Sequence, residues 1–166
     1  MGMELIETER LKLRRWQDGD FAGFARYYAD AENAKYVGGQ KDTEQAWRHF
    51  ALQIGHWQLK GFGYWAVVEK ATNIFVGCAG LWQSPSWPEL ELGYWLVREH
   101  QGKGYAQEAC RRCKNHALET LHASSLVSYI DPTNAASIRL ATRLGAVYEG
   151  TIELASYGSH RVYRHF

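Results

Sequence analysis

Cysteine, proline and an excess of either charge are all scarce in this sequence. Its 166 residues include three cysteines and three prolines. Such a small and odd number of cysteines argues against the disulfide framework of small secreted domains. The 19 Lys and Arg residues nearly balance the 18 Asp and Glu residues, for a net charge of +1. Dedicated nucleic-acid binders usually carry a clear basic excess, so we expect no nucleic-acid partner.

Long apolar runs are missing as well. No stretch approaches the ~20 residues that cross a bilayer, and residues 1–4 lack the basic-then-apolar pattern of a signal peptide. We therefore expect a cytoplasmic protein without a membrane partner. Two of the three prolines share one local loop at residues 84–88, and no repeat or linker interrupts the chain. Residues 1–166 are therefore expected to form one domain.

Aromatic residues, by contrast, are abundant. They make up 14% of the chain, including seven Trp and ten Tyr, so disorder is excluded and the rings must be packed or stacked. Hydrophobic periodicity predicts strands and helices in alternation. Strands are expected at residues 8–16, 64–69, 74–82, 89–97, 126–130, 146–150 and 161–166. Helices are expected after Asp18 or Asp20, from Asp42, from about residue 105 to 121, and between Asn134 and Gly145.

The spacing of apolar residues also predicts the inward faces of three helices. These faces are Phe21, Phe24, Ala25 and Tyr28 in the first helix, Trp47, Phe50, Ala51 and Ile54 in the second, and Ala106, Ala109, Cys110, Cys113, Ala117 and Leu121 in the third. The order of elements predicts an α/β fold in which helices cover both faces of a mixed sheet.

Residues 101–106, Gln-Gly-Lys-Gly-Tyr-Ala, lie between a predicted strand and a predicted helix. Small residues let backbone N–H groups converge there, and the helix dipole adds partial positive charge, so the segment favours a pyrophosphate. Lys103 adds a mobile positive charge. The segment lacks the Ser or Thr that follows the lysine of a P-loop, and the third glycine of a Rossmann loop. A glycine-rich turn without a ligand is the alternative interpretation.

Five segments, in order, together carry a more specific signal. They are residues 8–14 (TERLKLR), 77–81 (GCAGL), 91–96 (ELGYWL), 101–106 (QGKGYA), and 134–137 (NAAS) followed by 144–146 (LGA). The set resembles the GCN5-related N-acetyltransferases (GNAT), and within them the RimJ/RimL-type branch. The resemblance implies a single GNAT domain, a mixed and mostly antiparallel central sheet with a splayed strand pair, acetyl-CoA as co-substrate, and no metal. Relatives of this kind are often homodimers, which the aromatic content permits here.

The resemblance also assigns cofactor-binding residues. It places pyrophosphate on the N–H groups of residues 102–106, and pantetheine along the strand that ends at residues 95–97. The residues implied are Leu96, Val97, Gln101, Gly102, Lys103, Gly104, Tyr105, Ala106 and Asn134. In the family, a bulge splays this strand from its neighbour, and a freed N–H polarises the thioester carbonyl. Asn134 also fits an ordinary N-cap.

Acetyl transfer to an amine needs a neutral nitrogen, so a base must take a proton from the ammonium. By its place in ELGYW, Glu91 is the first candidate, and Glu89 is the second because it shares the same strand parity. Both carboxylates could instead bind the cationic amine, or be solvated residues of a half-exposed strand. The leaving thiolate needs a hydrogen-bond donor. Many relatives use a Tyr that corresponds to Ala141 here, and the RimJ/RimL branch implies Ser137 instead.

The acceptor is the least determined part. A protein N-terminus and a small amine both fit attack in a ternary complex, with Trp82 and Trp87 predicted to wall the acceptor site. A non-catalytic acyl-CoA binding or sensing module is the alternative function. Cys110, Cys113 and His116 lie within one predicted helix and offer at most three ligands, so we expect buried apolar cysteines and no metal site.

Overall fold

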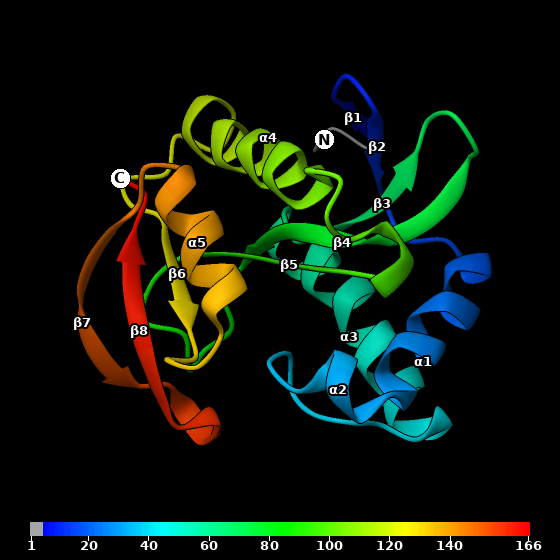
Figure 1. Cartoon of the computed structure of the whole chain (residues 1–166), viewed down its shortest axis with the longest axis horizontal. Coiled ribbons are helices and arrows are strands. Elements are labelled where there is room, and N and C mark those ends of the chain that lie inside the picture. Colours follow the sequence, from blue (N-terminus) through cyan, green and yellow to red (C-terminus); the bar gives the residue numbers. More distant parts are fainter. Residues whose placement is uncertain (1–4) are drawn as a thin grey trace.

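An eight-stranded sheet runs through the computed structural model, which describes residues 5–166 (Figure 1). Residues 1–4, on which the expectation about a signal peptide rests, lie outside this part of the chain. The strands are β1 (Leu5–Glu7), β2 (Leu11–Arg14), β3 (Tyr64–Glu69), β4 (Ile74–Trp82), β5 (Glu91–Leu96), β6 (Val127–Ile130), β7 (Val147–Glu153) and β8 (Ser159–Arg164). Their order across the sheet is β1-β2-β3-β4-β5-β6-β8-β7. The pair β5–β6 is parallel and the other described neighbours are antiparallel.

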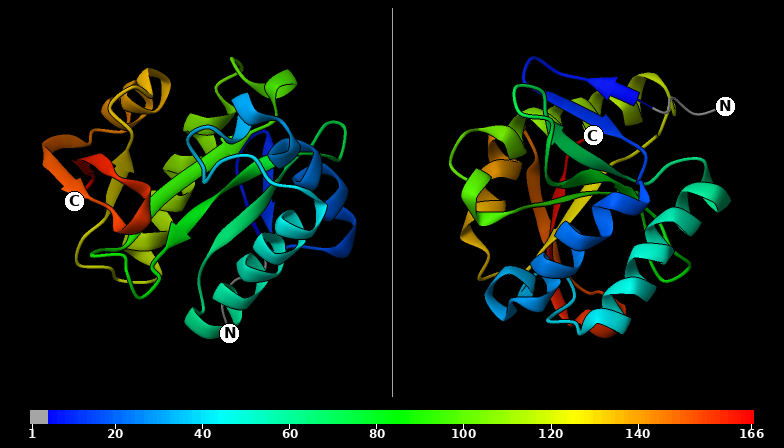
Figure 2. Two further views of the ribbon diagram at one scale, coloured as in Figure 1. Left: turned by 90° about the horizontal axis from the view of Figure 1, so that it is seen from below. Right: turned by 90° about the vertical axis from the view of Figure 1, so that its right-hand side faces the viewer.

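Five helices accompany the sheet in the described part of the chain. They are α1 (Phe21–Ala29), α2 (Ala31–Ala34), α3 (Thr43–Lys60), α4 (Tyr105–Glu119) and α5 (Ala135–Arg143). Helix α4 packs on β4 and β5 from one side, while α1 and α3 pack together on the other side (Figures 1 and 2). This confirms the predicted fold class, a mixed and mostly antiparallel sheet with helices on both faces. None of these helices is long and apolar enough to cross a membrane.

Aromatic rings fill the core between the sheet and the pair α1–α3. Trp16 packs edge-on against Phe24 and Phe50, with ring centroids 5.5 Å apart in both pairs. On the other side of the sheet, α4 presents the small residues Ala109, Cys110, Cys113 and Ala117, all of them buried. Small side chains let this helix approach the sheet closely. The predicted inward face of α4 is therefore confirmed for these four residues, whereas Ala106 and Leu121 are half-buried and Leu121 lies beyond the end of the helix. The three cysteines are free and buried.

The first strand differs from its prediction. Residues 5–14 form a hairpin of β1 and β2 rather than one strand over residues 8–16. Thr8 closes the turn, because its N–H donates to Leu11 O at 2.9 Å and its hydroxyl accepts from Leu11 N at 3.0 Å. The short helix α2 was not predicted. Asp30 caps the N-terminus of this helix, since its side chain accepts hydrogen bonds from two backbone N–H groups.

The buried face of α3 was also predicted wrongly. Phe50 is buried as expected, but Trp47 and Ile54 are 45% and 42% exposed, and Ala51 is exposed. The helix turns Ala46, Phe50, Gln53, His56 and Trp57 inward instead. Two of these residues are polar, so a count of apolar residues alone gave the helix the wrong rotation.

Candidate active site

Strands β5 and β6 diverge in the middle of the sheet, and the candidate site lies in the opening between them (Figure 1). The two strands pair in register at Glu91 and Val127. Beyond that pair the hydroxyl of Ser128, not a backbone amide, donates to Leu92 O at 2.8 Å. The splayed pair that the resemblance implied is therefore present. The pairing of β5 with β4 is regular from Glu91 to Leu96.

Backbone donors of β5 face this opening. The amide of Val97 donates to Val76 O of the β4 side at 2.9 Å. Successive N–H groups of a strand point to alternate edges, so the amides of Tyr94 and Leu96 point away from β4 and toward β6. Because β6 has diverged by that point, these two N–H groups are available to an oxygen that enters the opening.

A second set of backbone donors lies at the start of α4. Gly102 and Gly104 adopt left-handed conformations, with φ of 77° and 82°, which glycine tolerates best. The first backbone hydrogen bond of the helix runs from Glu108 N to Gly104 O at 3.1 Å. The N–H groups of residues 105–107 therefore have no partner within the helix. They stand at the positive end of its dipole, where an anion is stabilised.

These donors border a cleft of about 620 Å³ between the α4 loop and α5. Of the residues predicted to bind the cofactor, Leu96, Gln101, Gly102, Gly104, Tyr105, Ala106 and Asn134 line it. Gln101 also donates to Leu96 O at 3.0 Å, which ties the loop to the end of β5. Asn134 caps α5 by accepting from Ser137 N at 3.3 Å, so its N-cap role is confirmed, whereas a contact with pantetheine stays a prediction.

Three arginines that sequence reasoning missed also line the cleft. They are Arg98, Arg139 and Arg143. Arg139 and Arg143 are four residues apart on α5 and therefore share one face of it. Together with the free amides of α4 they make the cleft an anion site. In the sequence, Arg139 and Arg143 follow the predicted N-cap Asn134 with a spacing of four residues. This spacing was the signal that could have identified them as residues of the cleft.

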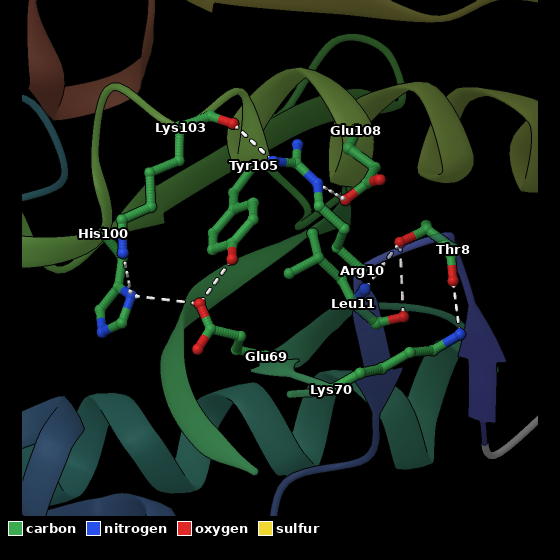
Figure 3. A network of polar contacts seen from close by, with 9 residues as sticks. All are labelled: Thr8, Arg10, Leu11, Glu69, Lys70, His100, Lys103, Tyr105 and Glu108. Atoms are coloured by element: carbon green, nitrogen blue, oxygen red, sulfur yellow. Dashed lines mark hydrogen bonds and ion pairs between the residues drawn. The ribbon is translucent and has the colours of Figure 1, made fainter. Parts of the chain in front are cut away.

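The predicted phosphate ligand Lys103 lies elsewhere (Figure 3). It is not among the residues that line the cleft. Its Nζ is 3.5 Å from His100 Nδ1, in a network centred on the buried carboxylate of Glu69. That carboxylate accepts hydrogen bonds from the Tyr105 hydroxyl at 2.5 Å and from the Thr72 hydroxyl at 2.7 Å, which hold its pKa below the usual range. The network fixes the side chain of Tyr105, the first residue of α4. Glu69, Thr72 and His100 are not among the residues that line the cleft.

Val97 is likewise absent from the cleft lining, since its amide is turned toward β4. On the outer side of the loop, Arg10 donates to Lys103 O at 2.8 Å and lies 3.4 Å from the Glu108 carboxylate (Figure 3). The backbone of the loop is therefore held by the turn between β1 and β2 as well as by α4.

Glu91 lies where β5 and β6 separate. Burial raises the pKa of its carboxyl to about 8. One oxygen accepts a hydrogen bond from Tyr129 N at 3.3 Å, which lowers the pKa and opposes the effect of burial. The Trp87 indole also lowers the pKa, although its N–H has no hydrogen bond of standard geometry. A carboxyl that titrates near neutrality suits a general base.

Glu89 does not reach this position. The argument from strand parity fails because β5 begins only at Glu91. Both oxygens of Glu89 accept from Arg164 at 3.0 Å, and one also accepts from Ser125 at 3.0 Å. Its carboxylate is therefore occupied by a structural ion pair, and Arg164 holds its pKa below the usual range.

Ser137 contacts Tyr94, to which sequence reasoning gave no catalytic role. Its hydroxyl lies 3.1 Å from the Tyr94 hydroxyl. Burial raises the pKa of Tyr94, and the hydrogen bond between Tyr94 and Ser137 opposes that shift. Ala141 stands where many relatives have a tyrosine, so that position supplies no hydroxyl. The phenol of Tyr94, on β5, borders the same small space as Ala141.

A second cavity, of about 320 Å³, extends from Glu91 to the loop at residues 84–88. Trp82 and Trp87 both line it, as predicted for an acceptor site. This acceptor cavity, the anion cleft and a smaller space between β5 and β6 share Tyr36, Val37 and Tyr94 in their walls. Groups held in the cleft and in the acceptor cavity would therefore meet beside Tyr94.

Across residues 5–166, no three His, Cys, Asp or Glu side chains are grouped so that they could hold a metal ion. Burial raises the pKa values of Cys110 and Cys113, which makes both thiols poor metal ligands.

Glu91→Gln is expected to make the fold more stable at alkaline pH. The folded protein holds a proton on Glu91 up to about pH 8, whereas an unfolded chain releases it near 4.3. This contribution to stability is complete below the unfolded pKa and is lost as the pH rises through the folded pKa. Between pH 6 and 9 the wild type should lose about 3 kcal/mol relative to the variant, or about 8 °C in Tm. Thermal melts at both pH values test this, and parallel curves would contradict it.

The model of the family described as acetyltransferase (GNAT) domain matches residues 10–147. The chain is 30% identical to N-acetyltransferase p20 of Bacillus licheniformis over 154 residues, which cover 90% of this chain and 86% of that protein.

Two solved structures are also similar. An acetyltransferase from Agrobacterium tumefaciens has a TM-score of 0.90 at 31% identity and covers 100% of this chain and 96% of its own. A ribosomal L7/L12 α-N-protein acetyltransferase, solved in complex with coenzyme A, has a TM-score of 0.80 at 19% identity and covers 97% of both chains. At 19% identity, the similarity to the second structure shows a shared fold.

Proposed function

The chain belongs to the acetyltransferase (GNAT) domain family and is an acetyltransferase; on that premise we propose that it moves the acetyl group from acetyl-CoA to a primary amine. One observation carries the proposal. The anion cleft and the cavity that holds Glu91 meet at the opening between β5 and β6, beside Tyr94. Donor and acceptor can therefore bind together, as direct attack in a ternary complex requires.

The cleft fits coenzyme A by its chemistry. Free amides at the start of α4, together with Arg98, Arg139 and Arg143, suit phosphates. The β5 edge leads from there to the opening and suits the pantetheine arm. When bound, acetyl-CoA supplies the activated acyl group. The amides of Tyr94 and Leu96 then act as donors to the carbonyl oxygen, where negative charge develops.

Glu91 is the proposed base. An amine in water is mainly an ammonium, which cannot attack. In the buried cavity, the neutral carboxyl and neutral amine are favoured over the ion pair because both charges lose their hydration. The proton of the ammonium therefore passes to the Glu91 carboxylate. The C–N bond then forms and the C–S bond breaks. The proton that the acylated nitrogen releases passes through the Tyr94–Ser137 hydroxyl pair to the departing sulfur, so coenzyme A leaves as its thiol.

Arg139→Ala is expected to raise the Kd for coenzyme A about tenfold, because a hydrogen bond between two charged groups is worth about 1.5–3 kcal/mol. Arg111→Ala is the matched control, since Arg111 is on the same layer of helices but lines a different groove, on the outer side of α4. Calorimetry at two salt concentrations measures both variants. Equal affinities would remove Arg139 from the phosphate site.

The finer form of this proposal is the RimJ/RimL-type branch, a cytoplasmic location, and one of two acceptors, a protein N-terminus or a small amine. Their support is the order of the five segments and the ribosomal-protein acetyltransferase fold. No observation favours the sensing module over the enzyme, because Glu91 lies at the junction of the cavities and a hydroxyl pair accompanies it.

Release of free thiol from acetyl-CoA over a panel of amines tests the proposal. We expect release that requires an amine, with initial rates that indicate a ternary complex. If acetyl-CoA bound but no amine caused release, and Glu91→Gln behaved as the wild type, the sensing module would be favoured instead.

A further inference from the structure

The acceptor cavity is walled mainly by aromatic rings. Nine of its 19 lining residues are Trp or Tyr. Trp82, Trp87 and Tyr157 form the end away from the anion cleft, and Trp95 and Tyr94 form the end beside it. Aromatic walls bind flat apolar groups and favour a cation over their faces. An amine with an apolar body therefore matches these walls better than a polar one does.

Charge in the cavity comes from one carboxyl group. Among its lining residues, all within residues 5–166, Glu91 is the one Asp, Glu, Lys or Arg. Two histidines also line the cavity. Burial lowers the pKa of His49 to about 4, so it is neutral, and one ring nitrogen of His160 lies 3.0 Å from Gly158 O. An acceptor that carries a carboxylate would find no Lys or Arg among these lining residues to pair with it. A second ammonium would find no second anion. Burial of either charge unpaired is costly.

The rings are held in place before an acceptor binds. Trp82 stacks on His56 with centroids 4.0 Å apart and planes 15° apart. His56 Nε2 accepts from Gln83 N at 3.2 Å, so His56 Nδ1 carries the proton and donates to Phe62 O at 2.8 Å. Trp95 stacks on Tyr27 at 3.9 Å. Rigid walls bind a matching ligand with little loss of entropy.

A contact across the opening forms part of one wall of the cavity. Tyr36 follows α2, and its hydroxyl donates to Thr133 O at 3.2 Å on the β6–α5 side. Tyr36 borders both the acceptor cavity and the anion cleft. A volume of about 320 Å³ lies at the small end of ligand sites. It suits one ring with a short side chain, and a polypeptide would enter only with its first residue.

From these walls, charges and dimensions we infer that the acceptor is an arylalkylamine: a primary amine on a short alkyl chain whose body is an uncharged aromatic ring. The nitrogen lies at Glu91 and the ring packs among Trp82, Trp87 and Tyr157. This inference rests on the proposed function and names its substrate class. The nitrogen loses one proton as it gains the acetyl group, and coenzyme A leaves with its thiol, so no further reactant is needed.

A panel of matched amines tests the inference with the full chain at pH 8 and saturating acetyl-CoA. The probes are 2-phenylethylamine, L-phenylalanine, which adds a carboxylate, putrescine, which replaces the ring by a second ammonium, and a tetrapeptide amide with a free N-terminus. We expect kcat/KM for 2-phenylethylamine to exceed each of the others by about tenfold or more. An equal or higher value for any of the other three would overturn the inference and leave the proposed function standing.

A binding measurement distinguishes failure of the proposed function from failure of the inferred ligand class. Calorimetry of 2-phenylethylamine with the protein and coenzyme A, which cannot react, reads the cavity without catalysis. Binding without turnover of any amine would contradict the proposed function and support the ligand class. Neither binding nor turnover would overturn both.

Variants at the exposed end of the cavity add a second measurement. Trp87→Ala should lower kcat/KM for 2-phenylethylamine about tenfold and leave the KM for acetyl-CoA unchanged. Trp47→Ala is the control, because Trp47 lies on α3 outside the cavity. Equal effects of the two substitutions would contradict the placement of the ring.

Discussion

Glu91→Gln should lower kcat about a thousandfold, the middle of the range for loss of a general base. Glutamine keeps the shape of the side chain and its hydrogen bond with Tyr129 N but cannot take a proton. The KM for acetyl-CoA should stay unchanged, because Glu91 does not line the anion cleft. Thiol release at pH 8 over a range of acetyl-CoA concentrations measures both constants.

Glu89→Gln is the control for this experiment. It should lose stability, because Glu89 accepts two hydrogen bonds from Arg164, but it should keep kcat. If instead Glu89→Gln lost activity and Glu91→Gln kept it, the assignment of the base would be wrong.

The pH profile gives the same test a second readout. A base whose pKa is about 8 is mainly protonated at pH 7, so kcat/KM of the wild type should rise with pH through this value. This rise near pH 8 should be absent from the pH profile of Glu91→Gln. The rise due to the amine itself, near pH 10, should remain in both proteins. A limb near pH 8 that persisted in the variant would belong to another group.

Gly104→Glu should weaken coenzyme A binding more than about a hundredfold, since it adds a negative charge beside the anion cleft and distorts the first turn of α4, whose free amides border that cleft. Gly104 has a φ of 82°, and a Cβ there would lie 3.3 Å from the Arg10 guanidinium. A residue with a side chain is therefore strained, by roughly 1–2 kcal/mol.

Gly104→Ala separates this strain from the charge. Both variants should lose a similar amount of thermal stability, while Gly104→Ala should weaken binding only several-fold. Calorimetry with coenzyme A and a thermal melt of each variant are sufficient. Wild-type affinity in Gly104→Glu would refute the phosphate-loop assignment.

The sequence predicted most of the fold because its main elements obey local rules. The hairpin of β3 and β4 and the inner face of α4 follow from periodicity. The left-handed end of α5 follows from Gly145, whose φ is 85°. The rotation of α3 did not follow. His56 is turned inward by its hydrogen bond to Phe62 O and Gln53 by packing, and no periodic pattern encodes either.

The site was predicted less completely, for a similar reason. Motifs located Glu91 and the loop at residues 101–106, which are contiguous in the chain. Arg139 and Arg143 look like the charged face of an ordinary helix until α5 is placed beside the start of α4. Tyr94 was missed because its hydroxyl reaches the Ser137 position from another element. Lys103 shows the converse, since its backbone lies in the loop while its side chain turns toward His100.

A crystal structure with bound acetyl-CoA tests the central claim most directly. The account predicts that the acetyl group lies in the opening between β5 and β6. Its carbonyl oxygen should lie about 2.9 Å from the N–H nitrogen of Tyr94 or Leu96, and its carbonyl carbon should face the cavity that holds Glu91. An acetyl group outside this opening, or turned away from that cavity, would contradict the account.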